Sequence, residues 1–77
     1  MIVKTKLIIR YENEKTAKTV FDSVHPDNIG YIIDRVKGKE LIFETKGENP
    51  GTIRNTIDDL LADISSVEKI LNLNNFQ

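Results

Sequence analysis

Cysteine is absent from this 77-residue sequence. The chain therefore has no disulfides, no thiolate zinc ligands and no thiol nucleophile. Domains this short that work outside the cell usually depend on disulfides, so we expect a cytoplasmic protein. A domain of this size buries only about 60% of the surface that its unfolded chain exposes, and it gains stability from a partner.

An excess of positive charge is also missing. Eleven lysines and arginines oppose twelve aspartates and glutamates, and the formal net charge is −1. Proteins that bind nucleic acid alone usually carry a basic excess, because contacts to phosphate supply much of the affinity. No apolar run approaches the roughly 20 residues of a membrane span. Lys4 and Lys6 interrupt the apolar N-terminus, so we expect neither a signal peptide nor a membrane partner.

The hydrophobic pattern changes period along the chain. Residues 3–11 alternate, which predicts a strand. Residues 14–24 carry a helical apolar stripe, with Asn13 as the expected N-cap. Pro26 is expected to end this helix, and Asp27 and Asn28 to form a turn.

Two further strands are predicted at residues 31–36 and 41–46, joined by a short turn at Gly38. A loop then leads to a long helix beginning at Asn49 and Pro50 or at Thr52. The apolar stripe of this helix consists of Ile53, Ile57, Leu60, Leu61, Ile64, Val67 and Leu71. The order β-α-β-β-α predicts an α+β fold, a three-stranded antiparallel sheet with two helices on one face, formed by residues 1–77 as a single domain.

The second face of this sheet is unusually apolar. Its expected apolar residues are Ile2, Ile8, Ile32, Val36 and Ile42, and its expected charged residues are Lys4, Lys6, Arg10, Asp34, Glu44 and Lys46. A solvated face needs fewer branched apolar side chains, which favours self-association through Ile8, Ile32, Val36 and Ile42. Alternatively, long cationic side chains and cross-strand charge pairs keep this face wet.

The sequence offers no motif for catalysis. His25, the one histidine, lies near Asp27, but no nucleophile is placed beside it and we expect a local hydrogen bond at the helix end. Asp59 and Asp63 fit a solvated helix face better than a cation site. The glycines form no phosphate-binding array. We therefore expect no enzyme, no metal and no cofactor.

An RNA-binding module is the alternative from another functional class. Lys37 and Lys39 flank the predicted turn and have the charge to touch phosphates. However, no Gly-x-x-Gly clamp and no pair of base-stacking aromatic residues is present.

Two segments carry a family resemblance. Residues 21–28 read Phe-Asp-Ser-Val-His-Pro-Asp-Asn, and residues 52–61 read Thr-Ile-Arg-Asn-Thr-Ile-Asp-Asp-Leu-Leu. Their order and spacing resemble the polarised-growth chromatin-associated controller family, the small dimerising subunit of the archaeal KEOPS complex. The resemblance extends over roughly residues 3–71.

This resemblance implies a non-catalytic scaffold. KEOPS makes N6-threonylcarbamoyladenosine at position 37 of tRNA, and the family's small subunit pairs with a second copy while its helices dock the catalytic ASKHA-fold subunit. tRNA is then a partner only through the assembled complex. The implied partner-binding residues are Phe21, Ser23, Pro26, Asp27, Asn28, Arg54 and Ile57.

The implied contact of Arg54 is with a partner carboxylate or with the Asp27 turn. Pairing with Asp58, four residues along the helix, is the structural alternative. The chain also departs from the family pattern, which usually has a small residue where Asn55 stands and asparagine where Asp58 stands. The alternative is therefore a diverged paralogue that pairs with the standard subunit instead of with itself.

Overall fold

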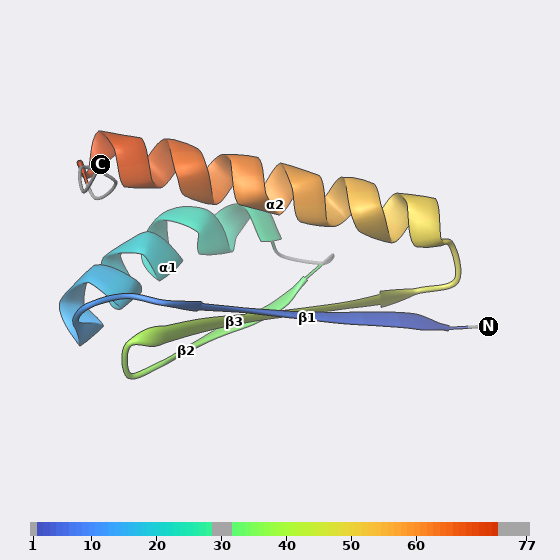
Figure 1. Ribbon diagram of the computed structural model, residues 1–77, viewed down its shortest axis with the longest axis horizontal. Helices are drawn as coiled ribbons and strands as arrows, with labels where there is room; N and C mark the ends of the chain where they lie inside the picture. The colour runs from blue at the N-terminus through green and yellow to red at the C-terminus, as the bar shows by residue number, and fades with distance from the viewer. Residues whose placement is uncertain (1, 29–31, 73–77) are drawn as a thin grey trace.

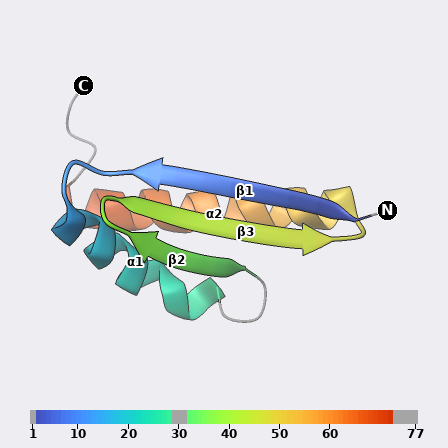
Figure 2. The same cartoon turned by 90° about the horizontal axis from the view of Figure 1, so that it is seen from below.

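The computed structural model describes residues 2–28 and 32–72. Its elements are β1 (Val3–Arg10), α1 (Glu14–Asn28), β2 (Ile33–Lys37), β3 (Glu40–Gly47) and α2 (Pro50–Ile70). The strands form an antiparallel sheet in the order β1-β3-β2, and both helices cover the same face of it (Figure 1). Figure 2 shows the opposite face, with β3 between its neighbours and no helix in front. The predicted α+β fold and element order are confirmed.

The hydrophobic core lies between the sheet and the two helices. The central strand supplies Leu41 and Phe43, both fully buried. Helix α1 contributes Ala17, Val20 and Val24, and α2 contributes Leu60 and Ile64. These positions are the ones that the apolar periodicity predicted. Tyr31, where the second strand was predicted to begin, lies outside the described residues.

Asparagine side chains begin both helices. Asn13 Oδ1 accepts a hydrogen bond from the backbone N–H of Thr16 at 2.8 Å, as its predicted N-cap role requires. Asn49 Oδ1 accepts from the N–H groups of Gly51 and Thr52 at 2.8 and 3.3 Å. Pro50 at the first helical position has no N–H that would need a partner. Asn49 and Pro50, and not Thr52, therefore begin α2.

Helix α1 is longer than predicted. It continues through Pro26 to Asn28, so the expectation that Pro26 ends the helix before a turn at Asp27 and Asn28 is wrong. A proline loses one backbone hydrogen bond, but its fixed φ of about −65° is itself helical. Asp27 and Asn28 keep helical geometry after Pro26, in spite of that lost bond and of crowding between the proline ring and the carbonyl of Asp22.

The side chains of β2 point to the opposite faces of the sheet from those predicted. The two-residue turn at Gly38, whose φ is +58°, sets Val36 directly opposite Leu41. Directly opposite residues share a face, and Leu41 is in the core, so Val36 lies on the helix side. Ile32 also packs against the core. The placement of Ile32 and Val36 on the open face is therefore wrong, and Ile33 and Arg35 lie there instead.

Tyr11 connects the end of β1 to the last helix. Its hydroxyl donates a hydrogen bond of 2.6 Å to Oε2 of Glu68, fifty-seven residues away in the chain. Burial, the hydrogen bond to Glu68 and the negative charge of that carboxylate raise the pKa of Tyr11 above its ordinary value of about 10. The bond holds α2 over the sheet edge.

This raised pKa predicts a loss of stability in alkaline solution. Deprotonation of Tyr11 is easier in the unfolded chain, so its contribution is complete below about pH 10 and is lost as the pH rises further. Tyr11→Phe removes the hydrogen bond and is expected to cost about 1 kcal/mol at neutral pH. Urea denaturation between about pH 8 and 11 should show a smaller alkaline decline in the variant than in the wild type. Equal slopes would contradict the assignment.

Candidate functional site: exposed apolar side chains on the sheet and on α2

The uncovered side of the sheet, called here the open face, presents one set of alternating side chains from each strand. These are Lys4, Lys6, Ile8 and Arg10 of β1; Glu40, Ile42, Glu44 and Lys46 of β3; and Ile33, Arg35 and Lys37 of β2. The residues predicted for this face in β1 and β3 are where the alternation placed them. Ile32, Asp34 and Val36, which were also predicted for this face, are not on it. The face is therefore built of cross-strand rows of known register.

Three ion pairs cross the open face between strands. Arg10 Nη2 lies 2.8 Å from Oε2 of Glu40. Glu44 lies between two cations, with its Oε1 at 3.6 Å from Arg35 Nη2 and 3.9 Å from Lys6 Nζ. Exposed pairs of this kind contribute little stability, about 0–1 kcal/mol each. The predicted alternative of cross-strand charge pairs is therefore present on this face.

Apolar side chains nevertheless remain accessible between these charges. Ile8 is 51% exposed and Ile33 is 63% exposed. Ile42 lies directly between Ile8 and Arg35 in the central strand and is only 6% exposed. Of the four predicted self-association residues, Ile8 is the accessible one, and Ile33 is the residue that sequence reasoning missed. The turn register could have identified it, because Val36 opposite Leu41 forces Ile33 outward.

Exposed apolar side chains also lie along α2, although Leu61 and Ile70 are nine residues (about two and a half turns) apart and therefore point to opposite sides of the helix. Leu61 is 43% exposed and Ile70 is 82% exposed, and Leu71, at the C-cap, is also exposed. Leu61 and Leu71 belong to the predicted stripe, so the part of the stripe that enters the core is narrower than expected. Leu61 is at the margin of the stripe, and Leu71 follows the last helical residue. Figure 1 places α2 on the side of the molecule opposite the open face.

The predicted partner-binding residues are spread over both helices. Phe21 is half-buried and packs against the core, and the Ser23 hydroxyl donates to the carbonyl of Thr19 at 2.9 Å. In α2, Ile57 is half-buried and Arg54 is exposed. No hydrogen bond or ion pair joins Arg54 to Asp58 or to any other residue within 2–28 and 32–72. The side chains of Pro26, Asp27 and Asn28 lie outside what the structure describes.

His25 has a partner that the sequence did not reveal. Its Nδ1 lies 2.9 Å from both carboxylate oxygens of Asp34 in β2, so Nδ1–H donates to the carboxylate. The His25 ring stacks on Phe21, with centroids 5.1 Å apart. The Asp34 side chain is only 5% exposed. The expectation of a local bond at the helix end is therefore wrong, because β2 turns Asp34 toward α1.

This contact predicts different costs for its two members. Asp34→Ala removes a buried carboxylate and its hydrogen bonds, and it is expected to reduce the free energy of unfolding by about 2 kcal/mol. His25→Ala removes a half-exposed ring and should cost less. Chemical denaturation of both single variants and the double variant measures their coupling. Additive single effects would show that the pair contributes nothing to stability.

Comparisons with known proteins leave the family undecided. No family model matches this chain, and no curated protein matches it. Within residues 2–28 and 32–72, no group of three or more histidine, aspartate or glutamate side chains is arranged to hold a metal ion. Neither described helix combines the length and the apolar character needed to cross a bilayer.

Proposed function

We propose that this protein is a cytoplasmic, non-catalytic scaffold subunit of a KEOPS complex, which makes N6-threonylcarbamoyladenosine at position 37 of tRNA. In this proposal it pairs with a second copy or a paralogue through the open face. Its helices dock the catalytic ASKHA-fold subunit, and tRNA is engaged through the assembled complex.

The observation that supports a scaffold is the presence of exposed apolar side chains on both layers. Ile8 and Ile33 are exposed on the sheet, and Leu61 and Ile70 are exposed on α2. A subunit that connects two partners needs two contact surfaces that do not compete for space. An enzyme of this size would instead concentrate its chemistry in one cleft. The resemblance of residues 21–28 and 52–61 to the KEOPS small subunit supplies the identity of the partners.

The test is native mass spectrometry of the purified protein, alone and mixed with the KEOPS catalytic subunit from the same source. A dimer that captures the catalytic subunit is the expected result. A monomer that captures it would favour a diverged paralogue whose partner is missing. A stable monomer that ignores the catalytic subunit would overturn the proposal.

A variant of α2 makes this test residue-specific. Leu61→Asp places a charge in the proposed docking surface and is expected to weaken capture of the catalytic subunit about ten-fold or more, since a buried leucine contributes about 1.5–3 kcal/mol. Lys15→Gln, on the exposed side of α1, is the matched control. Self-association should survive in both variants, because the open face is on the other side of the molecule. Unchanged capture by the Leu61 variant would place the docking surface elsewhere.

A further inference from the structure

Positive charge is concentrated on the open face. Of its eleven side chains, six are lysine or arginine and two are glutamate, which gives this face a net charge of +4. The whole chain has a formal net charge of −1, so all its other residues together carry −5. The near-neutral chain therefore has one basic surface on an otherwise acidic molecule. A contact surface with such an excess of one sign selects a partner of the opposite sign.

The two carboxylates of the open face are already paired within the sheet. Arg10 pairs with Glu40, and Glu44 lies between Lys6 and Arg35. Three further cations of this face form no ion pair within residues 2–28 and 32–72, namely Lys4, Lys37 and Lys46. The carboxylates that would balance them have to come from another molecule.

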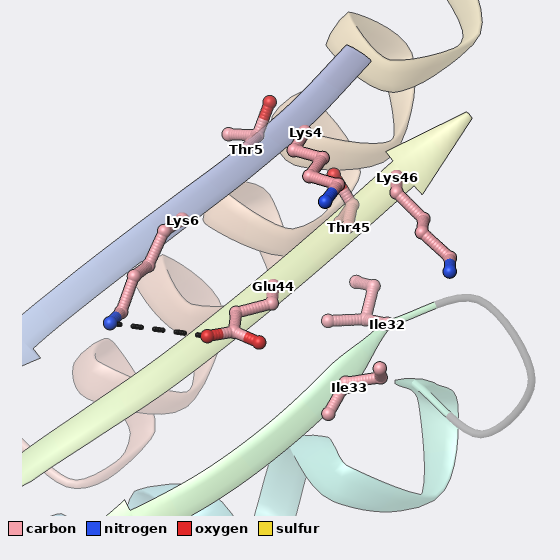
Figure 3. A pocket seen from close by; sticks show the side chains of 8 residues that line it. All are labelled: Lys4, Thr5, Lys6, Ile32, Ile33, Glu44, Thr45 and Lys46. Atoms are coloured by element: carbon pink, nitrogen blue, oxygen red, sulfur yellow. Dashed lines mark ion pairs between the residues drawn. The ribbon is translucent and has the colours of Figure 1, made fainter. Parts of the chain in front are cut away.

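Lys4 and Lys46 show this imbalance most directly. They lie opposite each other on the neighbouring strands β1 and β3 (Figure 3). Like charges in directly opposite positions destabilise a sheet. In the same view, Lys6 of β1 lies 3.9 Å from Glu44, which shows how a carboxylate serves the next position along the strand. A carboxylate supplied by a partner would offset the repulsion between Lys4 and Lys46.

The apolar side chains of the open face lie between its charged ends. Ile8 of β1 is directly opposite Ile42 of β3, and Ile33 of β2 is opposite Glu44, the next open-face residue along β3. Ile8 and Ile33 are exposed. The unpaired lysines flank this centre, with Lys4 and Lys46 at one end of the face and Lys37 at the other. An apolar centre with a charged rim is typical of surfaces that contact proteins.

A nucleic acid fits this surface less well than a protein. None of the eleven side chains is aromatic, so no ring is present to stack on a base. Glu40 and Glu44 project from the central strand and would repel a phosphate backbone laid across the face. A protein partner can place carboxylates opposite the lysines and apolar side chains opposite Ile8 and Ile33.

A second copy of the chain is also a poor match. In a contact with two-fold symmetry the same face lies on both sides, so each copy brings six cations and only two carboxylates. We propose that the preferred occupant of the open face is a different protein chain, whose contact surface carries an excess of carboxylates around apolar side chains. A second copy is the weaker occupant. This inference rests on the proposed function, in which the open face is a protein contact surface.

The probe for this partner is a charge-reversed form of the chain itself, with Lys4→Glu, Lys37→Glu and Lys46→Glu in one molecule. Each reversal changes the charge by two, so the open face of the probe has a net charge of −2 and keeps its apolar side chains. Sedimentation equilibrium of each chain alone and of equimolar mixtures measures every pairing constant. At about 50 mM salt, wild type should bind the probe about ten-fold or more tightly than it binds itself, and this preference should shrink at about 500 mM salt.

The matched control reverses three lysines on the helices, Lys15→Glu, Lys18→Glu and Lys69→Glu. It has the same net charge as the probe, and its pairing with wild type should stay within about two-fold of wild-type self-pairing. Circular dichroism checks that both variants are folded. If the probe is unfolded, Lys4→Glu with Lys46→Glu replaces it, because this variant exchanges one like-charge pair for another. It should still pair with wild type more tightly than wild type pairs with itself.

The outcomes separate this inference from the proposed function. Wild-type self-pairing as tight as the mixed pair, or equal tightening by the control, would overturn the inference and leave pairing through the open face intact. Absence of association in every mixture would overturn that pairing as well. Tighter binding of wild type to a single-stranded RNA than to the probe would overturn the inference in favour of a nucleic acid.

Discussion

Phe43→Ala is expected to reduce the free energy of unfolding by about 3–5 kcal/mol. Phe43 is the largest fully buried side chain, and it lies on the central strand beneath both helices. Its truncation leaves a cavity that a three-stranded sheet cannot close, because β3 is held by hydrogen bonds on both sides. A domain of this length has a total stability of only about 4–12 kcal/mol. Much of the variant should therefore be unfolded at physiological temperature.

Urea denaturation followed by circular dichroism measures this loss. Both proteins must be compared at one concentration, because self-association would stabilise the folded state by mass action. Ile70→Ala is the matched control, since Ile70 is 82% exposed and its truncation should change stability by less than about 0.5 kcal/mol. A loss of less than about 1 kcal/mol for Phe43→Ala would contradict the central position assigned to this ring.

Ile8→Lys combined with Ile33→Lys is expected to raise the dissociation constant of the proposed dimer at least about 100-fold. Each exposed isoleucine contributes about 1.5 kcal/mol or more when a partner covers it, and each added lysine must be desolvated. Because both side chains are more than half exposed in the described chain, the substitutions should not disturb the core. Sedimentation velocity at several concentrations measures the constant.

The control for this pair is Ile70→Lys, which changes an exposed isoleucine of α2 and leaves the open face intact. It should leave self-association unchanged. If the control alone dissociates the dimer, then α2 and not the sheet is the self-association surface. If neither variant changes the constant, then a strand edge is the remaining candidate.

The sequence predicted the elements better than it predicted their orientation. Alternation in residues 3–11, the helical stripes and the two strands predicted around Gly38 identified five elements in the correct order. Each of these patterns depends only on neighbours along the chain. Residues 31–36 have apolar side chains at both odd and even positions, so their alternation did not choose a face. The turn at Gly38 chose it, by setting Val36 opposite Leu41. This information was in the sequence, but it required counting the register across the turn.

The proline at position 26 shows a different limit. Local rules correctly describe its missing N–H, but they do not weigh that single bond against the packing of α1 on the sheet. The contact of His25 with Asp34 belongs to that packing, and it joins the last turns of α1 to β2. For this reason, a prediction from local propensity alone placed the end of α1 too early.

For this protein, the sequence by itself determined the element order, the α+β class and most of the core, because hydrophobic period and capping residues act over a few positions. Tertiary structure alone decided which isoleucines face solvent and which carboxylates pair with His25 and Tyr11. These features depend on strand register and on residues far apart in the chain. The surfaces on which the proposals rest exist only after the sheet has formed.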